Sequence, residues 1–436
     1  MINRLNRSEV QGQGVRGYKY LIYLSAGVIM KFSFHNLTII AIALFFLSGC
    51  ATYQANVGPT QIRRAQAEIP EDQLMDVGIL TFESEEISEK EAEEEGTSNE
   101  IRKAEGNFIP YHLKNTLHQS SHWGAVRVIP AETDSIDLFV KGKIEESNGE
   151  HLTLGIEVVD ATGRHWFTNK YKMETSRSSY AGNRPGEKDA YQDLYNSIAN
   201  DMADFKKKLT GDDIKEIRTT AKLKFAEDFA PDAFNGYLAI GKNNITEINR
   251  RPADDDPMMA RLLKIREREY MYVDTLNEQY DAFYHDMWPS YENWRQLNRA
   301  ERLAMREIKR RALTQQLIGA LLIAGAIAAG SSNASGVGAI QTGMILAGTQ
   351  VIINGFNISK EAEIHEAAVQ ELGESFSSEM KPVVMEFEGK QYELTGSAAE
   401  QFNQWRALLR KIYFAETGFD PDPAQNAIES DTSENQ

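Results

Sequence analysis

The side chain with the most distinctive chemistry in this sequence is Cys50, the only cysteine in 436 residues. A lone cysteine leaves the chain no internal disulfide and no cysteine-based metal site. It ends the run Leu47-Ser48-Gly49-Cys50, and the stretch 37–47 before it is apolar. One interpretation is a buried helix followed by a core thiol, because free cysteines are often buried. The other is a targeting segment whose small residues mark a processing point.

The second interpretation is supported by a family pattern. The run resembles the lipobox of bacterial lipoproteins, in which an apolar residue and two small residues precede an invariant cysteine. The resemblance implies cleavage by a type II signal peptidase, a mature protein that begins at Cys50, and acyl chains on that residue in contact with membrane lipid. Several acyl chains would make the attachment stable, because one chain anchors only marginally. By resemblance to sorting in enteric bacteria, Ala51 favours the outer membrane, facing the periplasm, over the inner membrane.

Residues 1–49 are therefore expected to be a leader that the mature protein lacks. Met30-Lys31 supplies a positively charged start, and the apolar stretch 37–47 is too short to span a bilayer, which takes about 20 residues. The polar, basic stretch 1–29 is unusual for a signal peptide, so that either Met1 or Met30 can be the true start. Residues 50–74 are polar and lack sustained periodicity, which predicts a lipidated tether.

The chain is acidic, with 47 Lys+Arg against 64 Asp+Glu and a formal net charge of −17. The leader is basic, so the remainder is more acidic still. This balance argues against nucleic acid as a partner and against electrostatic binding to anionic lipid. The expected partners are membrane lipid, through Cys50, and other proteins or further copies of the chain.

The histidines and carboxylates form no convincing metal or catalytic motif. His118 and His122 are four residues apart and could share a metal on a helix, but Gly124 predicts that the helix ends there. His365-Glu366 lacks the second histidine of a zincin. Asp254-Asp255-Asp256 lacks the acidic alternation of a calcium loop, and capping of a helix is the preferred interpretation. We therefore expect no metal, no cofactor and no enzymatic activity.

Residues 75–210 alternate strand-like and helix-like patterns, which predicts an α+β domain with a small mixed sheet. Asn148-Gly149 lies between two strand-like runs and is a strong hairpin signal. Apolar residues at steps of three and four predict a helix over 189–209. The other expected elements are strands at 77–82, 125–130, 136–144, 152–159 and 165–171, a helix at 109–117, and a loop or fraying helix at 83–98. The domain resembles those of curli-secretion-type lipoproteins and the amino-terminal domain of the Tol translocation β-propeller protein, which implies a periplasmic module.

Residues 211–380 predict a mainly helical domain. One helix is expected over 225–239, interrupted by Pro231. Another begins at Pro257, which suits a first helical position, and carries an apolar and aromatic stripe that predicts packing on a partner helix. Pro289 is expected to end or kink this helix.

The segment 317–356 is the least polar part of the chain after the leader, and residues 317–329 and 337–356 contain no charge. Small residues recur every four positions in each half, a spacing that lets two helix backbones approach closely. These are Ala320, Ala324, Ala328, Ala339, Gly343 and Ala347. The segment predicts an apolar Gly/Ala helical hairpin and resembles the glycine-zipper segments of bacterial envelope proteins. A buried hairpin or oligomer interface and an insertion into or against a bilayer both remain open.

The carboxyl-terminal part predicts a small module and a tail. Residues 381–417 predict a β-hairpin with Gly389 in its turn and then an amphipathic helix that begins at Ser397. Residues 418–436 are acidic and poor in large apolar residues, which predicts disorder.

Three functions are compatible with these patterns. The leading hypothesis is a non-enzymatic envelope protein that acts in assembly, transport or scaffolding at the outer membrane. The second is an oligomeric channel or secretion component that inserts segment 317–356. The third is an envelope hydrolase whose site no motif reveals.

Overall fold

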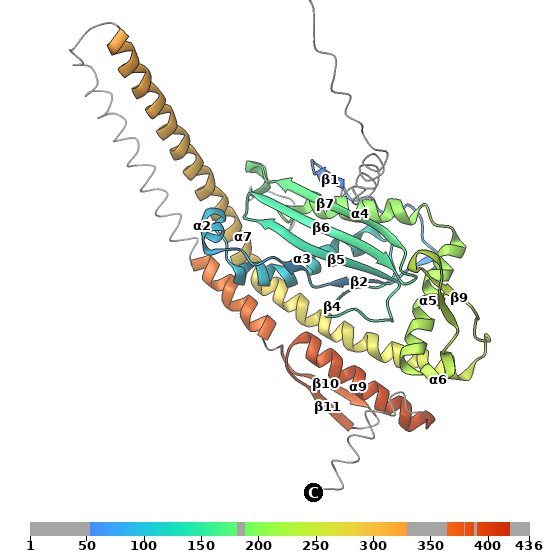
Figure 1. The fold of residues 1–436 in the computed structure, drawn as a ribbon. Helices are drawn as coiled ribbons and strands as arrows, with labels where there is room; N and C mark the ends of the chain where they lie inside the picture. Colours follow the sequence, from blue (N-terminus) through green and yellow to red (C-terminus); the bar gives the residue numbers. More distant parts are fainter. Residues whose placement is uncertain (1–52, 181–187, 329–363, 379, 388–389, 419–436) are drawn as a thin grey trace, which may run out of the picture. The chain divides into compact units, whose positions relative to one another are not determined.

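The computed structural model describes residues 53–180, 188–328, 364–378, 380–387 and 390–418. Residues Thr52–Gln436 form one compact unit, in which a mixed sheet is followed by a mainly helical region (Figure 1). The predicted α+β fold class is confirmed. The domain boundaries expected near residues 210 and 380 lie inside this unit.

The elements of the unit are short strands and helices of very different length. The strands are β1 (Tyr53–Asn56), β2 (Val77–Leu80), β3 (Glu83–Ser84), β4 (Val126–Ile129), β5 (Leu138–Ser147), β6 (His151–Asp160), β7 (His165–Glu174), β8 (Leu238–Ile240), β9 (Thr246–Ile248), β10 (Val383–Phe387) and β11 (Lys390–Leu394). The helices are α2 (Glu89–Glu95), α3 (Asn99–Ser120), α4 (Gln192–Lys206), α5 (Gly211–Phe229), α6 (Pro231–Phe234), α7 (Pro257–Ala328) and α9 (Ala398–Thr417), with a further helix at 364–378. Short 3-10 turns lie at Glu71–Gln73, Arg177–Tyr180 and Lys242–Asn244.

The main sheet has the strand order β1-β7-β6-β5-β2-β4, and β3 pairs with β5. β6 runs antiparallel to both β5 and β7, whereas β2 is parallel to both β4 and β5. The predicted hairpin at Asn148-Gly149 is confirmed as the connection between β5 and β6.

Helices cover one face of this sheet (Figure 1), where α3 contacts β2, β4 and β5, and α4 contacts β7. Val140 and Ile144 of β5 are fully buried on that face. Lys141 and Lys143 alternate with them and pair with carboxylates on the other face. This alternation is typical of antiparallel strands with one solvated face.

α3 is longer than the helix predicted over 109–117. Its first turn is capped by Ser98, whose side chain accepts a hydrogen bond from the backbone N–H of Ile101. Arg102 and Glu105 are buried in this early part of the helix. Because these buried positions are charged, the hydrophobic pattern does not reveal them. Within the expected loop or fraying helix at 83–98, residues 89–95 form α2.

The helix predicted over 225–239 is only partly present: its interruption at Pro231 is confirmed, but residues 235–239 are not helical. α5 ends at Phe229, and Pro231 opens the separate short helix α6. β8 and β9 follow as an antiparallel pair, and Asn243 and Asn244 between them adopt positive φ angles. Within the predicted range, Gly236 has a φ of 80°, a left-handed conformation that interrupts a helix.

α7 begins as predicted at Pro257, and the preference for capping over calcium binding is supported by contacts. Asp256 Oδ1 accepts hydrogen bonds from the backbone N–H groups of Met258 (2.9 Å) and Met259 (3.0 Å). An aspartate in this position satisfies amide groups that have no partner within the helix.

Pro289 does not end α7, which continues to Ala328. Of the two outcomes expected at this proline, a helix end is therefore wrong, and a kink stays a prediction. Proline removes one backbone hydrogen bond from a helix interior. Met287 and Tyr291 on either side of it are buried, and their packing offsets that loss.

The carboxyl-terminal elements supply the partner helices that the apolar stripe of α7 predicts. Tyr272 of α7 lies 6.1 Å from both Phe402 and Trp405 of α9, measured between ring centroids. Phe283 of α7 stacks on Phe376 of the helix at 364–378, with centroids 4.2 Å apart. The expected pair of strands is confirmed as β10 and β11, while Gly389 lies outside the described residues.

Residues 53–74, expected to be part of a tether, contact the folded unit. β1 pairs in parallel with β7, so this segment extends the sheet. The backbone N–H of Arg63 donates to Asn200 Oδ1 (2.8 Å), and the Arg63 side chain pairs with Asp204. Any free spacer is therefore shorter than the predicted range 50–74.

Candidate functional site

Most of the predicted site residues lie outside the described residues. These are Leu47, Ser48, Gly49 and Cys50 of the lipobox, together with Ala339, Gly343 and Ala347 of the predicted hairpin. Ala320, Ala324 and Ala328 lie on the last turns of α7, where the structure describes the backbone alone. No helix formed by the described residues combines the length and apolar character that crossing a membrane requires. The zipper packing therefore stays a prediction.

A network of polar contacts joins the turn between β5 and β6 to α7 and α2. We call residues 146–151 the hairpin tip. Asn148 shapes it, because its Oδ1 accepts hydrogen bonds from the backbone N–H groups of Glu150 (3.2 Å) and His151 (2.8 Å). Such side-chain contacts to the backbone two or three residues on are typical of asparagine in turns.

The hairpin tip lies directly against the backbone of α7. Gly149 has a φ of 73°, and a Cβ added there would lie 2.1 Å from the carbonyl oxygen of Arg295. Asn298 Nδ2 donates both to Asn148 O and to Glu95 O, each at 3.1 Å. One buried side chain of α7 therefore links the tip to the end of α2.

A fully buried ion pair lies beside this contact. Arg295 and Asp189 have side chains with no exposed surface, and Arg295 Nη2 lies 2.7 Å from Asp189 Oδ2. Burial, the largest single influence, would raise the pKa of Asp189, but the attraction of Arg295 and His112 and the hydrogen bonds from Arg295 and the Tyr191 backbone together hold this pKa below its ordinary value. The Arg295 guanidinium also lies over the ring of Tyr291, 4.2 Å from its centroid. The pair ties α7 to the segment that precedes α4.

A second buried carboxylate joins α3, β5 and α7. Glu105 of α3 accepts hydrogen bonds from the hydroxyl groups of Ser147 (2.5 Å) and Tyr291 (2.6 Å). Burial raises the pKa of Glu105 although nearby Arg102 opposes the rise. Glu105 Oε1 thus links α3 to β5 and α7, whereas Glu105 Oε2 has no hydrogen-bond partner among the described residues.

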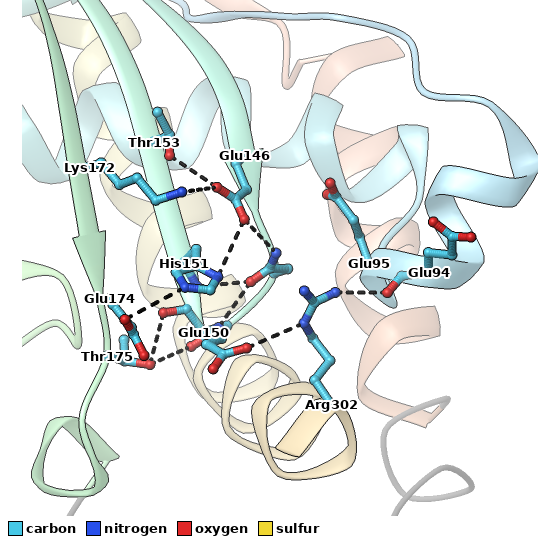
Figure 2. A network of polar contacts seen from close by, with 12 residues as sticks. Glu94, Glu95, Glu146, Glu150, His151, Thr153, Lys172, Glu174, Thr175 and Arg302 are labelled. Carbon is cyan, nitrogen blue, oxygen red and sulfur yellow. Dashed lines mark hydrogen bonds and ion pairs between the residues drawn. The ribbon is translucent and has the colours of Figure 1, made fainter. Parts of the chain in front are cut away.

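Further arginines of α7 continue the contact along one side of the helix. Arg299 Nε donates to Thr175 Oγ1 (3.0 Å), and Arg302 Nη1 donates to Glu94 O (2.8 Å). Arg302 Nε lies 3.7 Å from Glu150 Oε2 (Figure 2). Arg306 also pairs with Glu150. Steps of three or four residues place these side chains on one face of a helix.

Figure 2 also shows the group within the described residues that is best arranged to hold a metal ion. The register of β6 and β7 sets His151 opposite Glu174, and ligand atoms of these two residues and Glu150 lie within 4.8 Å of one another. Glu150 is already balanced by two guanidinium groups, which a dication would have to displace. The charges therefore fit an ion-pair network better than a metal centre.

Glu146 at the hairpin tip makes this network sensitive to acid. The contact with His151 (Nδ1 to Oε1, 3.3 Å), aided by Lys172, outweighs partial burial and lowers the pKa of Glu146 to about 2. A carboxylate with a lowered pKa stabilises the fold above its unfolded-state pKa, near 4.5, and this contribution is lost as the pH falls toward 2.

We expect Glu146→Gln to weaken the dependence of the free energy of unfolding on pH under acidic conditions. Between pH 4.5 and 2 the wild type should lose free energy of unfolding more steeply than the variant, which no longer takes up this proton. Urea unfolding followed by circular dichroism at several pH values measures both slopes. Glu174→Gln, at a side chain that is 68% exposed, is the control and should keep the wild-type slope. Parallel curves for wild type and Glu146→Gln would contradict the assignment.

The histidine pair considered from the sequence does not assemble a site. α3 contains His118 but ends at Ser120, so His122 lies beyond the helix, as the neighbouring glycine predicts. His122 Nε2 lies 3.2 Å from the carbonyl oxygen of Arg63.

Sequence patterns locate only part of the observed site. The Asn148-Gly149 signal identifies the turn, but no local pattern pairs Glu150 with arginines more than 150 residues later along the chain. No family model, curated protein or solved structure matches this chain. Its function has to be inferred from its own residues.

Proposed function

We propose that this chain is a lipid-anchored protein of the bacterial envelope, facing the periplasm at the outer membrane, with a non-enzymatic role in assembly, transport or scaffolding. The lipobox pattern at residues 47–50 supports the anchor. The polar groups of the candidate site support the scaffolding role, because they join structural elements to one another through ion pairs and hydrogen bonds.

The observation that carries this proposal is the continuity of α7. The same helix packs on α9, contacts the hairpin tip through Arg295 to Arg306, and continues to Ala328. Residues 317–328, the first half of the predicted Gly/Ala hairpin, are therefore a direct extension of a helix held in the core. At 1.5 Å per residue, Ala328 lies about 33 Å along the helix from Arg306. A folded unit that holds an apolar segment on a helix of this length suits a scaffold.

The second candidate is an oligomeric channel or secretion component that inserts segment 317–356. The four-residue spacing of Ala320, Ala324 and Ala328 along a continuous helix favours it, because small residues at this spacing allow close helix packing. The size of the protein in detergent distinguishes the two: a large ring supports the channel, and a monomer supports the scaffold.

Replacing Cys50 with serine tests the anchor. Serine has no thiol to acylate, so Cys50→Ser should abolish labelling by a radioactive fatty acid and release the protein from membranes. Ser48→Ala keeps a small residue in the lipobox and is the matched control that should retain both. Continued labelling of Cys50→Ser would contradict the proposal, and retention without label would assign the membrane contact to another segment.

A further inference from the structure

We propose that the exposed basic end of α7 binds the phosphate groups of anionic phospholipids. We define this basic end as Lys309, Arg310 and Arg311, three consecutive cations whose side chains are exposed. The inference deepens the proposed function, since it adds a membrane contact far along the chain from Cys50. The only part of the proposed function on which this inference depends is that a membrane lies nearby.

The first observation is a change in how the cations of α7 are neutralised. Arg295, Arg302 and Arg306 all pair with carboxylates of the folded unit. Beyond them, Arg311 pairs with Glu307 of its own helix. Neither Lys309 nor Arg310 forms an ion pair with any residue that the structure describes. The helix thus continues its series of cations past the last carboxylate of the hairpin tip that could balance them.

The second observation is the sequence that follows. Residues 312–359 contain no Asp, Glu, Lys or Arg, so the basic end directly precedes a long uncharged stretch. Met305 and Leu313, on either side of the basic end, are 49% and 60% exposed. Cations bordering apolar residues are the pattern of a segment at the interface of a bilayer, where phosphate groups lie beside acyl chains. A lipid surface satisfies both parts of this pattern.

The acidic net charge does not prevent this contact. At an ionic strength of 0.15 M the Debye length is about 8 Å, so exposed charges farther away are largely screened. The nearest exposed acidic group along the helix is Glu307, which Arg311 already balances. Local charge therefore decides the attraction, and the expectation from whole-chain composition does not apply at this position.

Vesicle sedimentation tests the inference with residues 52–436, the compact unit, which lacks Cys50 and so cannot carry its acyl chains. The probes are vesicles of phosphatidylcholine alone and vesicles that also contain phosphatidylglycerol. We expect binding only to the second, weakening as salt is raised. Each basic residue near an anionic surface contributes about fivefold in affinity, and Arg311 is balanced by Glu307, so Lys309→Glu/Arg310→Glu/Arg311→Glu should weaken binding by at least about twenty-five-fold.

The matched control is Lys381→Glu/Lys390→Glu/Lys411→Glu, which makes the same charge change at three other exposed lysines. It should bind like the wild type, and circular dichroism confirms that both variants are folded. Equal loss in both triple variants, equal binding to both kinds of vesicle, or no binding by the wild type would overturn the inference. Because Cys50 is absent, none of these outcomes depends on whether the chain is acylated.

Discussion

Replacing Arg295 with methionine is expected to lower the free energy of unfolding by about 3–5 kcal/mol, the usual effect of removing one partner of a buried ion pair. The variant keeps an unbranched side chain of similar length but leaves the Asp189 carboxylate buried without its cation. Urea unfolding at neutral pH measures the loss. The difference from wild type should shrink in acid, because Arg295 holds the pKa of Asp189 below its ordinary value and protonation removes the charge that needs a partner.

Two further variants separate charge from packing. Asp189→Asn added to Arg295→Met removes the uncompensated charge and should recover much of the lost stability. Arg63→Met breaks an ion pair of nearly the same length, 2.8 Å, between side chains that are 51% and 42% exposed, and should cost less than about 1 kcal/mol. Equal losses for Arg63→Met and Arg295→Met would show that burial of the second pair is unimportant.

Replacing Gly149 with alanine is expected to lower the free energy of unfolding by about 2–5 kcal/mol, from a strained backbone and from overpacking against α7. Its φ of 73° is unfavourable for residues with a side chain, and the new methyl group would lie 2.1 Å from Arg295 O. The hairpin tip or α7 must therefore move. Urea unfolding measures the loss.

Gly236→Ala is the matched control for this prediction. Gly236 has a similar φ of 80°, but a Cβ there meets nothing within 4 Å. Gly236→Ala should therefore lower the free energy of unfolding only through backbone strain, by about 1–2 kcal/mol. If the two alanine variants are equally stable, the contact between the hairpin tip and α7 contributes nothing.

Local signals in the sequence predict much of this fold. Asn148-Gly149 locates the central hairpin, the aspartates before Pro257 locate the start of α7, and apolar residues at steps of three and four locate α4. Each depends on residues close together in the chain, where turn chemistry, capping and periodicity act directly.

The contacts of the candidate site could not be predicted in this way. Arg295 and Asp189 are 106 residues apart, and Glu105 and Tyr291 are 186 apart. A buried charge looks like a surface charge in the sequence, so these residues weaken the apolar pattern instead of marking the core. The continuation of α7 through Pro289 could not be predicted for a related reason. The local preference of proline is to end a helix, and tertiary packing on both sides of Pro289 overrides that preference.

The central claim is that the hairpin tip holds α7 at a fixed position relative to the sheet, so that the helix carries residues 317–328 as a rigid extension. Residues 52–436 contain no cysteine, so cysteines introduced at the exposed positions Thr168 of β7 and Leu313 of α7 take up one spin label each. Pulsed electron paramagnetic resonance then gives the distribution of distances between the two labels. We expect one narrow peak in the otherwise unchanged protein and a broader one when Gly149→Ala is added. A broad or multiple distribution without that substitution would contradict the claim.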